Sequence, residues 1–354
     1  MIVQEVKKLK IKIGNVEIGA GSPISVQSMT NTKTDDTHST LKQIEELAKL
    51  GCDIIRVAVL NRDCALALSE ITKYSPIPVV ADIHFDYRLA LIALENGVHA
   101  LRINPGNIGS IEHTKQVVMR AKQANVPIRI GVNAGSLEKD LWENKTLSLA
   151  DKMVESALRH VRILEGLDFN LIKISLKSSD VMTTIDAYRK IYNIVPYPLH
   201  IGLTEAGTLN MGTIKSSVAI GALLSEGIGD TIRVSLTENP KEEVKAGINI
   251  LKALNMRKSG VNFVSCPTCG RTQINLIELA KKVEETFSDL DYPITIATMG
   301  CAVNGPKEAA SADYGIAGGI DEGMIFKKGE FVKKVPQNML LDELKKLIYM
   351  DLKM

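Results

Sequence analysis

Three cysteines in the last quarter of the chain form the group best suited to chemistry. Cys266 and Cys269 are separated by Pro-Thr, and Cys301 follows 32 residues later. No histidine occurs after position 200, so this region cannot complete a metal site with four thiolates, or with three thiolates and an imidazole. Three thiolates and one weaker ligand would leave a metal position that a substrate can occupy.

A candidate for the weaker ligand is Glu308, seven residues after Cys301. Iron–sulfur clusters usually take four thiolates, and structural zinc takes four cysteine or histidine ligands. A carboxylate oxygen is harder than sulfur and is displaceable. The pattern therefore favours a catalytic 4Fe–4S cluster. Structural zinc and redox or disulfide use of the cysteines are the alternatives, because zinc ribbons also use a Cys-Pro-Thr-Cys-Gly turn.

Bulk composition narrows the class of protein. The 354 residues are enough for one large domain and a smaller one. The charge is nearly balanced, with 43 basic and 41 acidic residues, so we expect no nucleic-acid or membrane partner. Cys52 and Cys64 lie among apolar residues, as buried small side chains do. The first residues lack an apolar signal core, and we expect a cytoplasmic protein.

Residues 1–255 alternate between apolar, β-branched runs and segments of helical period. Strands that are apolar on both faces and separated by helices indicate a parallel sheet, and eight such units predict a closed (β/α)8 TIM barrel. An open doubly wound sheet is the rival, but Gly-x-Gly-x-x-Gly is absent after the first strand. Residues 256–354 are expected to form a smaller α+β domain with the iron–sulfur site. The eight expected strands are Pro23–Met29, Asp53–Val59, Pro78–Ile83, Ala100–Asn104, Pro127–Asn133, Leu171–Leu176, Leu199–Thr204 and Thr231–Leu236.

Five cations occur near the carboxyl ends of these strands, where TIM barrels carry their active sites. Several cations in one concave site repel each other unless an anion is bound, and Arg matches phosphate oxygens. The ligand is therefore expected to be a small molecule with more than one phosphate charge. The alternative is that each cation pairs with a neighbouring carboxylate. The expected cations are Arg56, Arg102, Arg129, Lys173 and Arg233, and polar residues nearby include Asn133 and Ser235.

Three further groups stand at the same strand ends. Asp82 and His84 are two residues apart and can share one face of a strand, so Asp82 can orient His84 or pair with an arginine. Glu205 ends the seventh strand beside a glycine-containing turn. A carboxylate does not help to bind phosphate, so Glu205 is expected to deliver a proton or orient a group, unless it pairs with Lys173 or Arg233.

The path of the chain predicts a second subunit. The last barrel helix, Lys241–Leu254, returns to the end opposite the active site. The next eight residues span at most about 28 Å when extended. That scarcely allows a domain to fold over its own barrel, so we expect a head-to-tail homodimer in which each smaller domain covers its partner's barrel.

The residues resemble one known family over essentially the whole chain: the bacterial 4-hydroxy-3-methylbut-2-enyl diphosphate synthases of the non-mevalonate isoprenoid pathway. The segments that carry the resemblance are Val26-Gln-Ser-Met-Thr30, Ala81-Asp-Ile-His-Phe85, Leu101-Arg-Ile-Asn-Pro-Gly106, Arg129-Ile-Gly-Val-Asn-Ala-Gly-Ser136, Leu203-Thr-Glu-Ala-Gly207, Cys266-Pro-Thr-Cys-Gly-Arg271 and Met299-Gly-Cys-Ala-Val-Asn-Gly-Pro306.

The resemblance implies a reductive reaction. Two electrons and protons open the ring of 2-C-methyl-D-erythritol 2,4-cyclodiphosphate and expel one hydroxyl as water. It also implies one 4Fe–4S cluster per subunit, with flavodoxin or ferredoxin as electron donor. A non-redox hydro-lyase with an open iron position, and a zinc-stapled scaffold protein, are the other function classes that we consider.

The resemblance also assigns residues. It places the cluster on Cys266, Cys269, Cys301 and Glu308, the essential acid at Glu205, and Asn304 beside the cluster. It gives the diphosphate to Arg56, Arg102, Arg129, Asn133, Lys173, Arg233 and Ser235. One departure occurs at Lys307, where the family has glycine. A lysine that adopted φ > 0 there would cost about 1 kcal/mol.

Overall fold

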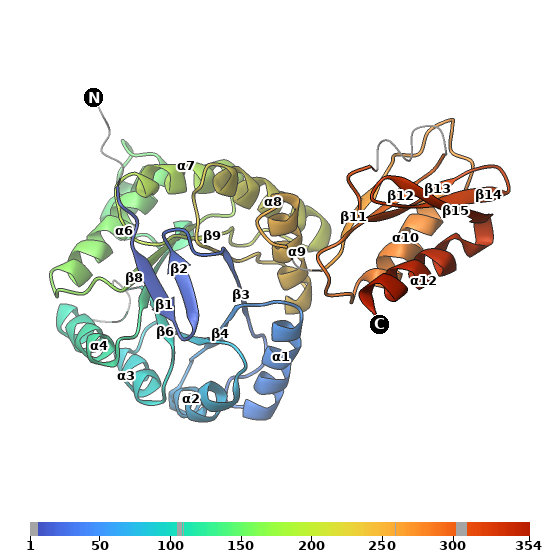
Figure 1. Ribbon diagram of the computed structural model, residues 1–354. Helices are drawn as coiled ribbons and strands as arrows, with labels where there is room; N and C mark the ends of the chain where they lie inside the picture. Colours follow the sequence, from blue (N-terminus) through green and yellow to red (C-terminus); the bar gives the residue numbers. More distant parts are fainter. Residues whose placement is uncertain (1–5, 105–107, 109, 259, 302–309) are drawn as a thin grey trace. The chain divides into compact units, whose positions relative to one another are not determined.

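The chain folds into two compact units, which Figure 1 shows in a computed structural model. The structure describes residues 6–104, 108, 110–258, 260–301 and 310–354. The first unit ends at Arg257 and the second begins at Lys258. Arg257 is held by the first unit, because its Nη1 lies 2.8 Å from Asp53 Oδ2 and its Nη2 donates to the carbonyl of Gly51 at 2.9 Å. Each unit is described by itself.

The first unit is a parallel eight-stranded barrel, as the sequence predicts. Neighbouring strands follow the order β8-β7-β6-β5-β4-β3-β10-β9, and a parallel bridge between Ile174 and Leu199 joins the two ends of this series. The strands are β3 Ser25–Met29, β4 Ile54–Ala58, β5 Val79–Asp82, β6 Ala100–Ile103, β7 Ile128–Asn133, β8 Ile172–Lys177, β9 His200–Ile201 and β10 Thr231–Ile232.

Helices surround this barrel, as the ring of coiled ribbons in Figure 1 shows. Each buries an apolar face against the strands, and most begin at a side-chain cap such as Asp36, Asn61 or Ser148. The connection between β7 and α6 contains the short helices η1 Ala134–Ser136 and α5 Lys139–Glu143. The surrounding helices are α1 Thr37–Lys49, α2 Arg62–Tyr74, α3 Tyr87–Glu95, α4 Ile111–Ala124, α6 Leu149–Glu165, α7 Val181–Tyr192, α8 Leu209–Ser225 and α9 Pro240–Ala253.

An antiparallel hairpin that the sequence analysis did not predict closes the amino-terminal end of the barrel. It consists of β1 Lys10–Ile13 and β2 Val16–Gly19. Ile13 and Ile18 of the hairpin form one buried cluster with Ile54 and Ala100, the first residues of β4 and β6. The end that remains for a ligand is therefore the carboxyl-terminal end of the strands, which we call the barrel mouth.

The second unit is a mixed five-stranded sheet with two main helices, α10 Leu276–Phe287 and α12 Leu340–Leu352. Strands β11, β12 and β13 are parallel, and β14 and β15 continue the sheet antiparallel. Phe287 and Leu344 of the helices pack with Ile296 and Ile316 of the sheet in the main core. The strands are β11 Asn262–Ser265, β12 Thr295–Met299, β13 Tyr314–Gly318, β14 Glu322–Lys327 and β15 Glu330–Pro336, followed by the short helix η2 Gln337–Met339. This is the smaller α+β domain that the sequence predicts.

In the described part of the chain, no helix combines the length and the apolar character needed to cross a membrane.

Candidate functional site

Alternation along the strands directs polar side chains into the barrel. In β7, Arg129 and Asn133 share one side of the strand with Gly131, and in β8 Lys173 shares a side with Lys177. These residues lie side by side on neighbouring strands, because Arg129 of β7 is in register with Lys173 of β8 and with Arg102 of β6. TIM barrels usually fill their interior with branched apolar residues. This barrel instead carries charges there, which indicates a ligand-binding interior.

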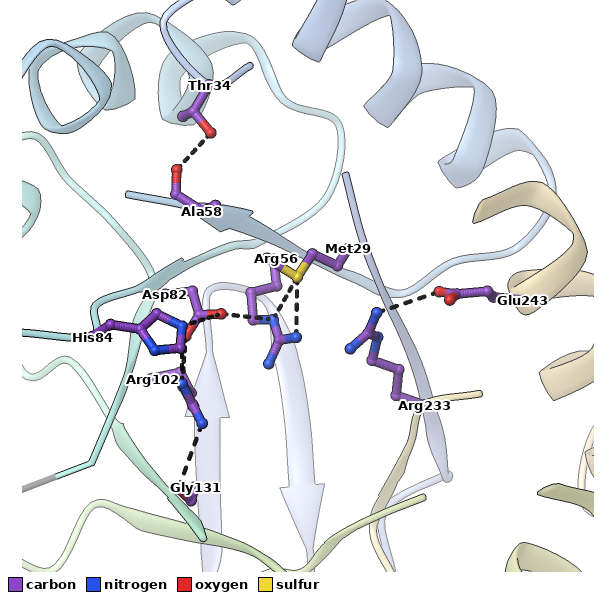
Figure 2. A network of polar contacts seen from close by, with 10 residues as sticks. All are labelled: Met29, Thr34, Arg56, Ala58, Asp82, His84, Arg102, Gly131, Arg233 and Glu243. Atoms are coloured by element: carbon purple, nitrogen blue, oxygen red, sulfur yellow. Dashed lines mark hydrogen bonds and ion pairs between the residues drawn. The ribbon is translucent and has the colours of Figure 1, made fainter. Parts of the chain in front are cut away.

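Asp82, at the end of β5, connects several of these charges (Figure 2). Its Oδ1 lies 3.1 Å from Arg102 Nη1, and its Oδ2 lies 3.5 Å from both Arg56 Nε and His84 Nε2. Burial by itself would raise the pKa of Asp82, but Arg56, His84 and Arg102 together lower it below its usual value. Asp82 is therefore an ionised carboxylate that contacts three basic side chains. It both orients His84 and pairs with arginines, the two roles that the sequence left open.

Arg56 is held from a second side by sulfur. Its Nε and Nη2 lie 3.2 and 3.0 Å from Met29 Sδ, as Figure 2 shows. A thioether accepts hydrogen bonds weakly and carries no charge. Burial lowers the pKa of Arg56 to about 10, with Arg233 and Arg102 acting in the same direction and Asp82 opposing them. Met29 thus orients the guanidinium without neutralising it.

Lys177 was not named by the sequence analysis, although the structure places it in the same group. The side chain is buried, and within the described residues its Nζ has no hydrogen-bond partner. Burial and the neighbouring Arg233 and Arg129 lower its pKa well below the ordinary value. The sequence did contain a signal, because Lys173, Ser175 and Lys177 alternate, but the expected strand was ended one residue too early. We use the name cation ring for Arg56, Arg102, Arg129, Lys177 and Arg233.

Lys173 lies among other buried polar groups. Its Nζ is 3.5 Å from Thr231 Oγ1, and the side chain lies beside Ile13 of the hairpin and Gln27. His200 is fully buried nearby, and its two ring nitrogens have no partner within the described residues. Burial, followed by Arg129 and Lys177, lowers the pKa of His200 well below its usual value. Basic groups are thus frequent in the barrel interior, and in the described part of the chain the side-chain nitrogens of Lys177 and His200 have no hydrogen-bond partner.

Two glycines allow the ring to form. A Cβ at Gly131 would lie 2.6 Å from Arg102 Nε, and a Cβ at Gly202 would lie 2.2 Å from the carbonyl oxygen of Arg233. Gly202 also has φ +147°, which an L-residue rarely adopts. Position 202 therefore requires glycine, because a Cβ would meet the backbone of Arg233, whereas at position 131 the Arg102 side chain would have to shift.

Glu205, Asn133 and Ser235 lie at the edge of the mouth. Glu205 is exposed and has φ +53°, a left-handed conformation that is uncommon outside glycine. Asn133 ends β7 and Ser235 follows β10, and both are partly exposed. Neither Lys173 nor Arg233 is an ion-pair partner of Glu205 in the described structure. All three side chains thus lie at or just beyond the ends of strands, at least partly exposed, where a ligand could reach them.

The cysteines of the second unit follow two neighbouring parallel strands. Ser265 of β11 is in register with Thr298 of β12, so Cys266 and Cys301 leave the sheet at the same edge. The amide of Gly300 donates to Cys266 Sγ at 3.1 Å, a contact that stabilises a thiolate. The amide of Gln273 donates to the carbonyl of Gly300 at 3.0 Å and ties the loop that carries Cys269 to the end of β12.

This arrangement fits a thiolate-bound metal group in its donor chemistry. Cys269 is exposed and Cys266 and Cys301 are partly exposed, so the sulfurs are accessible. Within the described residues, no three His, Cys, Asp or Glu side chains are arranged to hold a metal ion. Asn304, Lys307 and Glu308 lie outside the described residues. Metal-site geometry often forms only with the metal, because the ligands are held by it.

The fold and the site define a class of protein: a TIM barrel with a ring of cations at its mouth, followed by a smaller domain that carries three cysteines. Residues 8–248 match the GcpE TIM-barrel domain, and residues 262–350 match the GcpE protein C-terminal domain. The chain therefore belongs to the GcpE family, and the resemblance found in the sequence is confirmed.

Curated relatives are similar over almost their whole length. The chain is 59% identical to the 4-hydroxy-3-methylbut-2-en-1-yl diphosphate synthase (flavodoxin) of Clostridium acetobutylicum, over 97% of this chain and 98% of that protein. The Fusobacterium nucleatum protein of the same name is 56% identical, covering 97% of each chain. The Geobacter sulfurreducens protein, also of that name, is 57% identical, covering 96% of each.

Solved structures resemble the barrel only as architecture. Dihydropteroate synthase from Stenotrophomonas maltophilia matches with a TM-score of 0.52 at 12% identity, covering 70% of this chain and 97% of that one. A dihydropteroate synthase from Coxiella burnetii matches with a TM-score of 0.50 at 11% identity, covering 71% and 100%. At such low identity the likeness shows the fold alone.

Proposed function

We propose that this protein reduces 2-C-methyl-D-erythritol 2,4-cyclodiphosphate to 4-hydroxy-3-methylbut-2-enyl diphosphate and water. The relatives at 54–59% identity carry the name of this synthase with flavodoxin. The observation that carries the proposal is the cation ring: four of its five members, Arg56, Arg102, Arg129 and Lys177, are buried with few counter-charges in the described structure, an arrangement that favours a polyanionic ligand. A cyclic diphosphate supplies that charge in a compact form.

The ring residues would bind and orient the diphosphate. Arg102 and Arg56 are held by Asp82, so their guanidinium groups are oriented before a ligand arrives. Lys177 and Arg129 have buried donors without partners in the described structure, which phosphate oxygens can fill. Asn133 and Ser235 at the edge of the mouth, with His84, complete the proposed substrate site. Lys173 stays a prediction as a substrate ligand, since its side chain is buried and its Nζ lies beside Thr231.

Glu205 would supply the proton that the departing hydroxyl needs to leave as water. Its left-handed backbone supports this role, because uncommon backbone conformations cluster at functional sites. Its exposed position at the edge of the mouth leaves the carboxyl free to approach a ligand. A carboxylic acid that is placed within hydrogen-bond reach accelerates such proton transfers by about 10²–10⁴-fold.

A 4Fe–4S cluster, one per subunit, is proposed on Cys266, Cys269, Cys301 and Glu308. When bound, it would supply the two electrons one at a time and accept a weak oxygen ligand. The chain's own contribution is the Gly300 amide on Cys266 Sγ and the tether between Gln273 and Gly300. Asn304 is proposed beside this site. Zinc is the alternative occupant, and sulfide and iron analysis of anaerobically purified protein separates the two.

The decisive experiment is anaerobic turnover of the cyclic diphosphate with reduced flavodoxin or ferredoxin. We expect formation of the linear diphosphate at a ratio of two electrons per product. A non-redox hydro-lyase would convert its substrate without reductant. Turnover that does not depend on reductant, or failure to consume this substrate with a loaded cluster, would reject the proposal. Which carrier works better is read from the same assay.

We also propose a head-to-tail homodimer in which the partner's cysteine unit covers the mouth. Arg257 is bound beside Asp53, which precedes β4, so the chain leaves the barrel at its amino-terminal end. Large apolar side chains that are more than half exposed follow the strands around the mouth, as expected for a face that docks protein: Leu60, Phe85, Ile111, Trp142 and Met182. The cytoplasmic location expected from the sequence stays a prediction.

Mixing two inactive variants tests this dimer. Glu205→Gln damages only the barrel site, and Cys266→Ser damages only the cysteine site. Random exchange makes half of the dimers mixed, and each mixed dimer has one intact site if sites are shared, so about a quarter of the activity returns. No recovery after verified subunit exchange would reject the shared site.

A further inference from the structure

Glu243 is a buried carboxylate that reaches the barrel mouth from a surrounding helix. Its Oε1 accepts from the backbone amide of Leu236 at 2.9 Å. Its Oε2 accepts from Ser28 Oγ at 3.2 Å and lies 3.6 Å from Arg233 Nη2. Figure 2 shows Arg233 directed toward Glu243. One side chain therefore connects β3, the end of β10 and the loop that leads into α9.

The beginning of α9 explains why the carboxylate is held there. Asn239 caps the helix, Pro240 occupies its first position, and Glu242 and Glu243 follow in the first turn. Carboxylates are stabilised at this end of a helix by its dipole. The two acids nevertheless differ, since Glu242 Oε1 lies 2.9 Å from Lys245 on the exposed side, whereas Glu243 is only 6% exposed. The helix thus provides a matched pair of acids, of which one faces the mouth.

We propose that Glu243 is a positioning residue, which holds Arg233 and Ser235 in the arrangement that receives the diphosphate. This inference rests on the anion site of the proposed function. At 3.6 Å the ion pair orients the guanidinium but leaves its N–H groups available to phosphate oxygens. The bond to the Leu236 amide fixes the residue next to Ser235, so both candidate ligands on this segment depend on one carboxylate.

Its charge also faces the rest of the cation ring. The Glu243 carboxylate attracts Arg56 of β4 and Lys177 of β8 in addition to Arg233. It thereby offsets part of the repulsion that the ring experiences without ligand. This role is distinct from binding the substrate. Glu243 is on α9 and contacts Arg233, and it acts on the ligand through the arginine.

A double-mutant cycle tests the inference on full-length protein, with inorganic pyrophosphate as the probe and calorimetry as the measurement. Arg233→Met should weaken binding on the order of tenfold or more, as expected for loss of charged hydrogen bonds. Glu243→Ala should weaken it several-fold, and Glu243→Gln less, because the amide oxygen can still accept from Leu236. In the Arg233→Met background, Glu243→Ala should lose a clearly smaller factor than in the wild type, because only its effect through Ser235 remains. Glu242→Gln is the matched control and should bind as the wild type does.

The outcomes separate this inference from the proposed function. Wild-type protein that does not bind pyrophosphate, or Arg233→Met that binds it equally well, removes the anion site itself. Glu243→Ala that binds as the wild type does, or that loses the same factor in both backgrounds, removes only the positioning role. Circular dichroism confirms that each variant is folded. In turnover, Glu243→Gln should raise KM more than it lowers kcat, since it weakens binding common to substrate and transition state.

Discussion

The barrel mouth and the cysteine edge of the second unit differ in how far the protein organises them without a ligand. In the mouth, Asp82 lies within 3.5 Å of three basic side chains, and Glu243 joins three segments. At the cysteine edge the sulfurs are accessible, and the described residues do not assemble a metal site. Strand register fixes charges in the mouth, whereas thiolates are gathered by the metal that they bind.

The two regions are therefore ordered by different means: the mouth by strand register and the cysteine edge by the metal group that we propose for it. The mouth would bind its substrate at low ordering cost, because its guanidinium groups are already oriented. The proposed metal group would order the cysteine edge, so its loops should stiffen when the group is loaded. A substitution in one region should therefore damage the function of that region and leave the other region intact.

Cys266→Ser should have the largest effect. A serine oxygen is a harder and poorer ligand for cluster iron than a thiolate, so we expect cluster content and turnover to fall steeply. Pyrophosphate binding to the barrel should stay within twofold of wild type, because the mouth belongs to the other unit. Iron and sulfide analysis, followed by calorimetry, measures both. A parallel loss of pyrophosphate binding would show that the regions are not independent.

Glu205→Gln should reduce kcat by about 10²–10⁴-fold while the cluster and pyrophosphate affinity are retained. The amide keeps the size of the side chain but cannot deliver a proton. Anaerobic turnover with reduced carrier measures the loss, and visible absorption checks the cluster. Wild-type rates would contradict the acid role, and Glu238→Gln, on an exposed loop residue, is a suitable control.

Asp82→Asn should destabilise the barrel by roughly 3 kcal/mol or more, because it leaves Arg56 and Arg102 buried without their carboxylate. Urea unfolding measures the change. Pyrophosphate should restore part of the lost stability, since an anion can take the place of the carboxylate charge. Equal stability of variant and wild type would mean that the arginines are balanced elsewhere. Asp86→Asn, which removes an exposed pair with Arg88, is the control.

Lys177→Met should change how the stability of the barrel depends on pH. The folded pKa of Lys177 is lowered, so the unfolded chain binds a proton that the folded chain does not. Stability without ligand should therefore rise with pH between the lowered pKa and the usual value of 10.5. Each unit of lowering is worth about 1.4 kcal/mol, and the variant should show a flatter profile. An unchanged slope would mean that Lys177 is charged in the folded state.

Gly131→Ala should give the smallest effect, a several-fold weaker binding of pyrophosphate. The added Cβ would lie 2.6 Å from Arg102 Nε, so the arginine has to shift away from the ring. Gly135→Ala is a matched control four residues away, where a Cβ meets nothing within 4 Å. Calorimetry on the two variants compares them directly. Equal affinities would show that Arg102 adjusts without cost to binding.

The sequence by itself determined the barrel and most of the candidate mouth. Strands buried on both faces appear in the sequence as short apolar, β-branched runs between segments of helical period, so all eight were predictable. Within each strand, residues two apart had to share a side. Arg56, Arg102, Arg129 and Arg233 were found in this way. Lys177 was missed only because the strand was ended at residue 176. Cys266 and Cys269 were found because their spacing is local, and Cys301 because it is the one other cysteine in that part of the sequence.

Only the tertiary structure decided which charges pair. In the sequence, Glu243 resembles any acid in the first turn of a helix. Which side of α9 faces the end of β10 is set by tertiary packing, and no local sequence pattern predicts it. Met29 and the hairpin β1–β2 are comparable cases, because a thioether contact and a short antiparallel pair depend on segments far away in the chain. Sequence periodicity predicts which side of a helix or strand a residue faces. Its ion-pair or hydrogen-bond partner depends on which segments the tertiary fold brings close to it.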